Sequence, residues 1–502
     1  MTKVLCLNPP FLDRFTRNSR SPAISKGGCV YYPIWLGYTT GALEKAGHEV
    51  ILYDAPAAFK TIKDVLKVAK KFKPALTVVD TSTPSIYNDV KVLEAIKKEL
   101  PETFAILVGP HVTGTAEETL RTSKLIDAVA RSEYDFTIRE LANLLGKKSK
   151  LTKADLKKVK GIAFLENNKY VQTEDRPKIT AKELETEFPF VSEVYKKHLN
   201  IKDYFYPSVL YPEITIVTGR GCPFRCSFCF IPQVMNGHEF RFRSAKHLVD
   251  EFKWIKENLP EVKDIMIEDD TFTADRKRLF EIEREVKARG MDVTFTCNAR
   301  ADLNYEEVKA LEGAGCREIC VGFESGDQSV LNSIRKGTTV EKIRQFMKDV
   351  KKTDILVHGC FMLGNYGDTK ETIRKTIDFS KEIDPDTAQF FPIMVYPGTF
   401  DFKRFQEEGW LTTKSWSEWL TKEGTHNTIV SRPGLSAREL VMLCDKARKE
   451  FYLRPSFIAG KAKQCILHPK EIPRLALSTM TFMKYLIRGT NFETNSSVPS
   501  TS

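Results

Sequence analysis

Short apolar runs alternate with stretches of helical periodicity over the first 145 residues of the chain. Such runs are typical of strands buried on both faces of a parallel sheet, and the stretches between them predict helices. The predicted strands are Lys3 to Leu7, Glu49 to Tyr53, Ala75 to Asp80 and Phe104 to Gly109, and the predicted helices include Trp35 to Lys45 and Asn88 to Glu99. Right-handed crossovers would wind these elements into an open, doubly wound α/β sheet over residues 1–145, with ligands bound beyond the carboxyl ends of its strands.

A second alternation of strands and helices follows a polar, lysine-rich connection. Residues 146–205 are predicted to form a linker that contains a hairpin between Gly161 and Thr173. From Glu213 to about residue 408 the pattern gives six βα units, which are too few for a closed eight-stranded barrel. We therefore predict a partly open (β/α)6 barrel over residues 206–408, with reactive groups at the carboxyl ends of its strands.

The C-terminal part loses the strand pattern and becomes helical and basic. We predict a helical region over residues 409–490 and a disordered tail over 491–502. Within it, Pro473 to Arg488 places apolar residues roughly on one helical face among lysines and arginines. A basic amphipathic helix of this kind either lies on an anionic membrane surface or packs on its own domain.

Composition agrees with a folded, multidomain chain. Of the 502 residues, 42% are apolar and 28% charged, which is typical of globular proteins. The chain has no apolar stretch of membrane-spanning length and no export signal at its start, which predicts a cytoplasmic protein, with membrane association only through the C-terminal helix. The net charge of +11 suits anionic ligands or a membrane surface as well as nucleic acid.

Three cysteines lie within eight residues directly after the first strand of the barrel. They are Cys222, Cys226 and Cys229, in the run Gly219-Arg220-Gly221-Cys222-Pro223-Phe224-Arg225-Cys226-Ser227-Phe228-Cys229. One loop of this size can place three thiolates around a [4Fe-4S] cluster and leave one iron open for another ligand. The alternative is a zinc knuckle, but such sites close four ligands in pairs, and the nearest candidate for a fourth ligand is His238.

This loop resembles that of the radical S-adenosylmethionine superfamily, which has three cysteines at these spacings and an aromatic residue just before the last. The resemblance implies that Cys222, Cys226 and Cys229 ligate a [4Fe-4S] cluster whose free iron chelates the amino and carboxylate groups of S-adenosylmethionine. One electron from the cluster then cleaves the sulfonium to methionine and a 5'-deoxyadenosyl radical. Phe228 would pack near the adenine.

Later strand ends supply the predicted contacts to S-adenosylmethionine. Strand two ends in Glu-Asp-Asp where the family often has Gly-Gly-Glu, so Asp269 or Asp270 would receive the methionine ammonium, unless the pair caps the next helix. Arg300 could pair with the methionine carboxylate, and Glu324 could accept both ribose hydroxyls. Gly364 would let the adenine approach the backbone, although a bulge explains that glycine equally well.

A doubly wound, flavodoxin-like domain ahead of such a barrel resembles the cobalamin-binding class of the superfamily. The loops that would contact cobalamin contain Thr81, Ser82, Ser85, Gly109, His111 and Glu133. Pro56 stands where general cobalamin domains supply a histidine to cobalt, so the corrin would lack that lower ligand, unless cobalamin binding has been lost. His111 is the alternative cobalt ligand, or it lines the pocket.

The resemblance implies an enzyme that methylates an unactivated carbon with S-adenosylmethionine and cobalamin. A radical cyclase, rearrangement or anaerobic oxidation enzyme acting on a tetrapyrrole or lipid would use the same cofactors. A tRNA methylthiotransferase should have three further cysteines in its front domain, but only Cys6 and Cys29 precede the linker. An iron–sulfur electron carrier would need neither an open iron nor Glu324. We expect a small-molecule or lipid substrate, an external electron donor such as ferredoxin or flavodoxin, and no nucleic acid.

Overall fold

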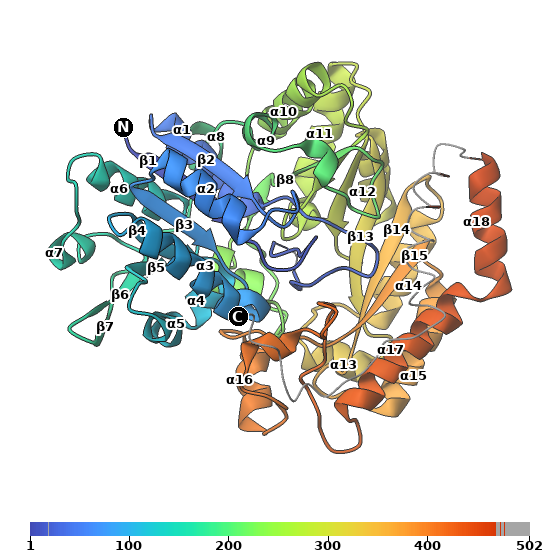
Figure 1. Ribbon diagram of the computed structural model, residues 1–502. Helices are drawn as coiled ribbons and strands as arrows, with labels where there is room; N and C mark the ends of the chain where they lie inside the picture. Colours follow the sequence, from blue (N-terminus) through green and yellow to red (C-terminus); the bar gives the residue numbers. More distant parts are fainter. Residues whose placement is uncertain (19, 468–471, 473–475, 477–502) are drawn as a thin grey trace.

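The computed structural model describes residues 1–18, 20–467, 472 and 476. In the front domain, parallel strands and helices alternate as predicted (Figure 1). These elements are β1 (Lys3–Asn8), α1 (Ile34–Lys45), β2 (Glu49–Asp54), α2 (Ile62–Phe72), β3 (Leu76–Asp80), the short turn η1 (Thr83–Ser85), α3 (Ile86–Glu99), β4 (Phe104–Val108), α4 (Pro110–Gly114), α5 (Ala116–Thr122), β5 (Ala128–Ala130) and α6 (Asp135–Leu145). Every residue of β3 and β4 is buried, because helices cover both faces of the sheet.

The predicted hairpin exists, but it is part of the front sheet rather than of a linker. Strand β6 (Ile162–Glu166) pairs antiparallel with both β5 and β7 (Lys169–Gln172), and the strand order is β2-β1-β3-β4-β5-β6-β7. The buried Ile162, Ala163 and Phe164 extend the core past the parallel strands. Helix α7 (Lys153–Leu156) precedes this hairpin. After the hairpin, the sequence between the two domains forms α8 (Ala181–Thr186), α9 (Val191–His198) and the turn η2 (Ile201–Asp203).

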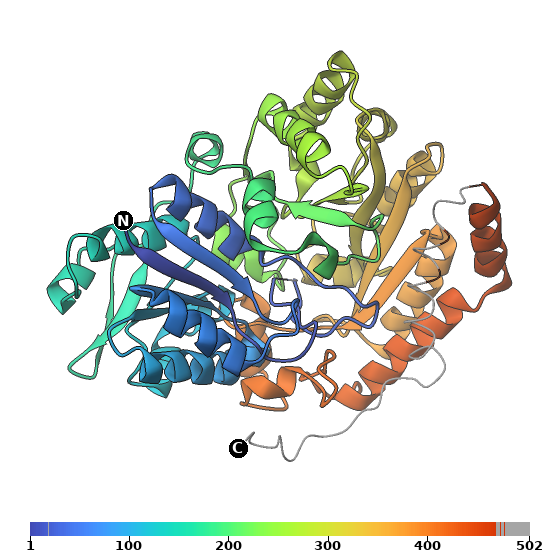
Figure 2. The same ribbon diagram turned by 45° about the horizontal axis from the view of Figure 1, so that its top comes forward.

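The second sheet is the predicted partial barrel. Its strands are all parallel and run in the order β15-β14-β13-β12-β11-β8, with the end strands β8 and β15 left unpaired to each other. Its elements are β8 (Glu213–Ile216), α10 (Ala245–Asn258), β11 (Asp264–Ile267), α11 (Arg276–Ala288), β12 (Phe295–Ala299), α12 (Tyr305–Gly313), β13 (Cys316–Glu324), α13 (Gln328–Ser333), α14 (Val340–Val350), β14 (Leu356–Leu363), α15 (Lys370–Ile383) and β15 (Thr387–Pro392). The carboxyl ends of these strands face the front domain (Figure 2).

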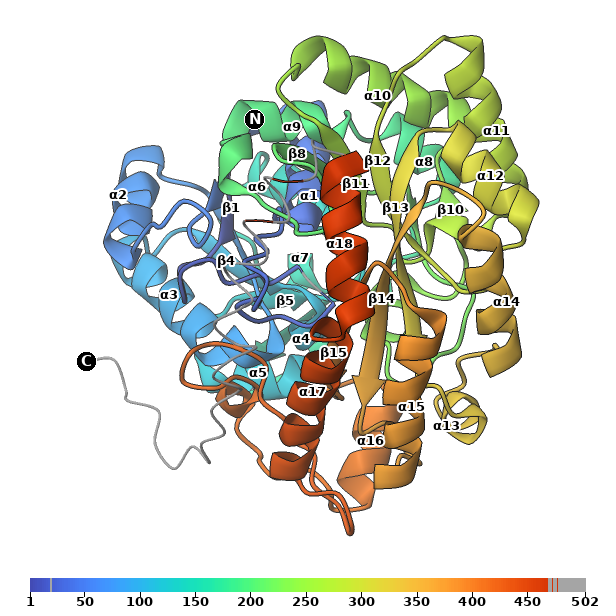
Figure 3. The same ribbon diagram turned by 90° about the vertical axis from the view of Figure 1, so that its right-hand side faces the viewer.

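The C-terminal region is helical only in part. Helix α16 (Phe400–Glu407) precedes an irregular stretch, and α17 (Ala437–Tyr452) and α18 (Pro455–Leu467) follow it along the edge strand β15 (Figure 3). Helices α17 and α18 confirm the predicted helical C-terminal region, whereas between Gly409 and Leu435 the chain forms the short turn η5 (Trp416–Trp419) and isolated bridges. Gly424 and Gly434 there have positive φ, which interrupts a helix. Most of the helix predicted from Pro473 to Arg488, and the tail, lie outside the described residues.

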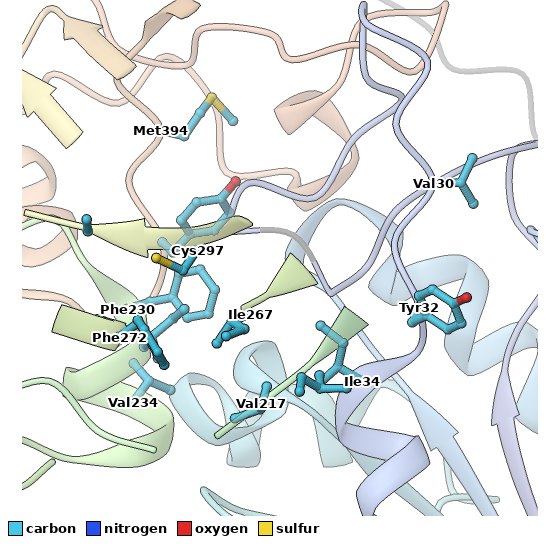
Figure 4. Close-up of a cluster of buried hydrophobic side chains, with 14 of the residues drawn as sticks. Val30, Tyr32, Ile34, Val217, Phe230, Val234, Ile267, Phe272, Cys297 and Met394 are labelled. Atoms are coloured by element: carbon cyan, nitrogen blue, oxygen red, sulfur yellow. The ribbon is translucent and has the colours of Figure 1, made fainter. Parts of the chain in front are cut away.

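The two domains share one apolar core. Val30, Tyr32 and Ile34 of the N-terminal segment belong to the same buried cluster as Val217 and Ile267 at the ends of barrel strands, and Figure 4 shows Ile34 beside Val217. No helix among the described residues is long and apolar enough to cross a membrane. A core that crosses the domain boundary favours contact between the front domain and the barrel, because separating them would expose that apolar surface.

A buried ion pair crosses the same boundary. Arg220 of the barrel donates from Nη1 to Oδ2 of Asp135 in α6 at 2.7 Å, and both side chains are almost completely buried. The guanidinium also lies over the rings of Trp35, Tyr38 and Phe188. A charge removed from water in this way must keep its partner.

We expect Asp135→Asn to lower the free energy of unfolding by about 3–5 kcal/mol, because it leaves the Arg220 charge buried without a counter-charge. The matched control is Glu117→Gln, which removes the exposed pair with Arg121 and should cost less than about 1 kcal/mol. Urea unfolding followed by circular dichroism checks both values. Equal shifts for the two variants would contradict the importance of the interface pair.

Candidate functional site

The cysteine loop is closed by a short antiparallel ribbon. Strand β9 (Gly219–Arg220) enters the loop and pairs with β10 (Arg241–Phe242), which leaves it. Gly221 has a φ of +89°, and a Cβ at this position would lie 2.0 Å from the carbonyl oxygen of Glu239. Only glycine therefore allows the two arms of the loop to cross directly before Cys222.

Polar side chains form hydrogen bonds to the backbone of the cysteine loop. The Gln233 amide donates to the carbonyl oxygens of Cys226, Ser227 and Cys229 at 2.8–3.1 Å. From the end of β11, Oδ2 of Asp270 accepts from the backbone N–H of Gly221 at 2.7 Å. Satisfied backbone groups of this kind keep an irregular loop in one conformation, so the thiols are positioned by the protein itself.

The three thiols line one cavity of about 1250 Å³. His238 directs Nδ1 at the carbonyl oxygen of Cys222, 3.2 Å away, rather than at a thiol. Among the described residues, no group of three His, Cys, Asp or Glu side chains is placed to hold a single metal ion. Three thiols of one loop on one cavity wall fit a three-cysteine iron–sulfur site. Burial raises the pKa of Cys229 to about 12, so ligation must release its proton.

Four of the residues predicted to contact S-adenosylmethionine line this cavity: Phe228, Asp270, Arg300 and Glu324. The Arg300 guanidinium lies 3.6 Å from the centre of the Phe224 ring, with Nη1 4.0 Å from Sγ of Cys226. Glu324 ends β13 with a φ of +65°, and its Oε1 accepts from Nζ of Lys336 at 2.7 Å. The roles of these four residues stay predictions.

Asp269 and Gly364 are not among the residues that line the cavity. Both have structural roles instead. Asp269 accepts from the backbone N–H groups of Thr218 and Gly219 and from the Thr218 hydroxyl at 2.6 Å, so it braces the start of the cysteine loop. Gly364 has a φ of +91°, and a Cβ there would meet the side chain of Leu440 in α17 at 2.4 Å. The glycine therefore permits helix packing rather than approach of an adenine.

Two cavity residues next to the cysteines were missed in the sequence. Oε2 of Glu268 at the end of β11 is buried without a hydrogen-bond partner, and Oε1 lies 3.6 Å from Nε of Arg20. Arg20 also donates to the carbonyl oxygen of Asp269 at 2.9 Å. Glu268 thus offers the cavity a carboxylate oxygen for a cation. Arg20 comes from a distant loop, so the sequence carries no signal that places it here.

The predicted cobalamin residues lie at the carboxyl end of the front sheet, where they bond to the protein itself. The hydroxyl groups of Ser82 and Ser85 are 2.7 Å apart, and Thr81 donates to the carbonyl oxygen of Val108 at 2.7 Å. Gly109 has a φ of +112°, and a Cβ there would lie 2.7 Å from the carbonyl oxygen of Thr81. This edge is therefore tightly packed.

His111 and Glu133 are also engaged within the protein. Nδ1 of His111 lies 3.2 Å from Oγ1 of Thr83, and its ring meets Trp416 edge-on at 5.1 Å between centroids. Burial lowers the pKa of His111 to about 3, so the imidazole is neutral. Glu133 binds both terminal nitrogens of Arg241 in β10 at 2.6 and 3.0 Å, so it joins the domains rather than presenting a free carboxylate.

The N-terminal loop covers this edge of the front sheet. Arg17 donates to Oδ1 of Asn8 at 2.7 Å and forms a fully buried ion pair with Asp89. A small cavity of about 10 Å³ lies between this edge and the barrel, bounded on the barrel side by Phe230 and Tyr396. This edge of the front sheet thus contacts the barrel closely, and we derive no chemical step through cobalamin.

Two family models match the chain. A model of the radical SAM superfamily matches residues 216–380, and a model of the B12 binding domain matches residues 21–142. These ranges contain the partial barrel with its cysteine loop and the doubly wound front sheet.

Curated relatives and solved structures agree with these matches. The chain is 30% identical over 427 residues to "Uncharacterized methyltransferase PH0819" of Pyrococcus horikoshii, covering 85% of this chain and 89% of that protein. It is 28% identical to an anaerobic magnesium-protoporphyrin IX monomethyl ester cyclase of Cereibacter sphaeroides, covering 75% of this chain and 60% of the cyclase. The radical S-adenosylmethionine methyltransferase TsrM of Kitasatospora setae, solved with cobalamin and a [4Fe-4S] cluster, shares the fold with a TM-score of 0.67 at 17% identity, covering 89% of this chain and 91% of TsrM.

We expect Glu268→Gln to weaken binding of S-adenosylmethionine about tenfold or more, because a charged acceptor contributes roughly 1.5–3 kcal/mol to a hydrogen bond. Equilibrium dialysis of the anaerobically reconstituted protein measures this affinity. Retention of the iron–sulfur absorbance shows that the cysteine loop is intact in the variant.

The control is Glu213→Gln, at the opposite end of the neighbouring strand β8. Burial raises the pKa of Glu213 to about 8, so this side chain is mostly neutral at pH 7 and the amide is a close substitute. Unchanged affinity in Glu268→Gln, or an equal loss in both variants, would exclude a direct role for Glu268.

Proposed function

The chain belongs to the radical SAM superfamily and carries a B12 binding domain, and from this premise we propose that it is a cobalamin-dependent methyltransferase acting on an unactivated carbon. The observation that carries the proposal is the placement of the two sheets. The carboxyl ends of the front strands, at Thr83 and Pro110, meet Phe230 and Tyr396 of the barrel. Phe230 directly follows the last cysteine of the loop and also lines the large cavity.

Within this arrangement the chain's own residues would bind the two cofactors and orient S-adenosylmethionine. When bound, the [4Fe-4S] cluster supplies the electron that cleaves S-adenosylmethionine, and cobalamin supplies a carrier for the methyl group. Cys222, Cys226 and Cys229 would hold the cluster. Arg300 would orient a carboxylate by charge-assisted hydrogen bonds, and Glu268 would take an ammonium group. The substrate and an external electron donor such as ferredoxin or flavodoxin are parts of this proposal.

Glu324 and Lys336 both line the cavity that the three cysteines line. Their ion pair is buried, and a Cβ on Gly322 would lie 2.4 Å from Oε1 of Glu324. Glycine at this position leaves room for the pair, which holds the carboxylate in one place. A carboxylate held in one place can accept hydrogen bonds from the hydroxyl groups of a nucleoside. Binding then costs less conformational entropy, because the side chain is already ordered.

Ring formation or oxidation by the same radical is the second candidate, because one relative is a cyclase. The two functions differ in what becomes of S-adenosylmethionine. Methyl transfer yields S-adenosylhomocysteine as well as 5'-deoxyadenosine, whereas the alternative chemistry yields 5'-deoxyadenosine without S-adenosylhomocysteine.

We expect the protein expressed with a cobalamin supply, purified without oxygen and reduced, to form both products. The triple variant of Cys222, Cys226 and Cys229 to Ala should lose cluster absorbance and 5'-deoxyadenosine, since no cluster thiolate remains. Cys360→Ala, on the wall of the same cavity, is the control and should keep the cluster. Liquid chromatography with mass spectrometry measures the products. 5'-Deoxyadenosine alone from the loaded protein would favour the cyclase chemistry, and an intact cluster in the triple variant would contradict the assignment.

A further inference from the structure

A guanidinium group lies against one of the three loop cysteines. Arg300 directly follows β12, and both Arg300 and Cys226 are buried. Nη1 of Arg300 lies 4.0 Å from Sγ of Cys226, a distance at which an N–H group can still donate to sulfur. Hydrogen bonds to the sulfur ligands and the local charge are among the factors that set the reduction potential of an iron–sulfur cluster.

The Arg300 side chain is fixed by three further contacts. It lies 3.6 Å from the centre of the Phe224 ring, and Nη2 donates to the carbonyl oxygen of Lys336 at 2.5 Å. Nε lies 3.3 Å from Oδ2 of Asp302. Phe224 belongs to the cysteine loop itself, so Arg300 contacts the loop at a ring as well as at a sulfur. The group is therefore already ordered where a cluster would bind.

The Asp302 carboxylate faces Nε and offsets part of the guanidinium charge. It does not face Nη1 in the printed geometry, where the nearest partner is the Cys226 sulfur. A donor that belongs to a charged group forms a stronger hydrogen bond than a neutral donor. The effect expected at the sulfur therefore depends on the directed N–H group and does not require an uncompensated charge.

The sulfur of Cys222 has a different kind of partner. Its Sγ lies 3.3 Å from Oγ1 of Thr271, but this hydroxyl donates to the carbonyl oxygen of Asp270 at 2.6 Å. A hydroxyl has one hydrogen to donate, so Thr271 does not also donate to the sulfur. The contact of Arg300 with Cys226 therefore differs in supplying a charged donor to a sulfur.

Lys336 connects this contact to the predicted nucleoside site. Its carbonyl oxygen accepts from Arg300, and its Nζ donates to Oε1 of Glu324 at 2.7 Å. One residue thus holds both the guanidinium and the carboxylate in place. Partners of this outer kind orient the groups that act directly on a metal site.

We propose that Arg300 is a positioning residue of the cluster site, which donates to the sulfur of Cys226 and raises the reduction potential of the bound cluster. The inference rests on the proposed function for the presence of the cluster, and it deepens that function by assigning a residue to the reduction step. In that step one electron passes from an external donor to the cluster, whose negative charge increases by one. A guanidinium has five N–H groups, so Arg300 can also orient a carboxylate.

The test is a redox titration of the anaerobically reconstituted full chain, with dithionite as reductant, mediator dyes, and neither S-adenosylmethionine nor cobalamin present. Electron paramagnetic resonance measures the reduced cluster. We expect Arg300→Met to lower the reduction potential, because it removes the N–H donor and the charge while an unbranched side chain still covers Phe224. We expect at least a tenfold fall in the equilibrium constant for one-electron reduction, which corresponds to about 59 mV.

Two further variants separate this role from a general effect of charge or packing. Arg300→Lys keeps a charged donor but loses the planar fork, so it should restore part of the potential. The control Arg344→Met removes a partly exposed arginine of α14 that pairs with Glu382 and is not a lining residue of the cavity, and it should keep the wild-type potential. A wild-type potential in Arg300→Met, or an equal fall in Arg344→Met, would overturn the proposal.

Loss of the cluster from Arg300→Met would move the comparison to Arg300→Lys and Arg300→Gln. The lysine variant should then have the higher potential, and equal potentials would overturn the proposal.

The potential is measured without turnover. If Arg300→Met lowers the potential but the loaded wild-type protein forms no S-adenosylhomocysteine, the proposed methyl transfer fails and the role of Arg300 stands. If methyl transfer occurs and the potentials are equal, the role of Arg300 fails alone.

Discussion

Buried ion pairs between the two domains are the constraint on which the rest of the structure depends. Arg220 and Arg241 stand on the two strands of the ribbon that closes the cysteine loop, and both bind carboxylates of the front domain. Charges removed from water cannot be left unpaired without a large cost in free energy. The cysteine loop is therefore held by both domains, and the front sheet must keep its carboxyl end toward the barrel.

This constraint explains why the cavity has walls from every part of the chain. The cysteine loop and the ends of β11, β12 and β13 supply its polar side, and the N-terminal loop and the C-terminal helices close the other sides. Arg20 of the N-terminal loop reaches Glu268 and the carbonyl oxygen of Asp269. Because the same loop covers the carboxyl end of the front sheet through Arg17, its position connects the two predicted cofactor sites.

The sequence predicted the elements whose signals are local. Buried strands such as β3 and β4 appear as apolar runs, and the cysteine spacing indicates its chemistry directly. Predictions were weaker where a residue's role depends on a distant partner. Asp269 and Gly364 follow the predicted strands, but each contacts another part of the protein. Asp269 accepts a hydrogen bond from Thr218 at the start of the cysteine loop, and Gly364 packs against Leu440 of α17. Arg20 and its partner Asp269 are 249 positions apart in the sequence. The hairpin was predicted as part of a linker because its pairing with β5 is not visible in its own residues.

The proposed function requires that the facing strand ends hold a cluster on the barrel and cobalamin on the front domain. Pro56 stands at the usual place of a cobalt-ligating histidine, and His111 is packed between Thr83 and Trp416. The most direct measurement is the electron paramagnetic resonance spectrum of protein expressed with a cobalamin supply and purified without oxygen. We expect a bound cob(II)alamin signal without nitrogen superhyperfine splitting from histidine. A preparation that retains no corrin would contradict the claim, and a clear nitrogen splitting would contradict the absence of a histidine ligand.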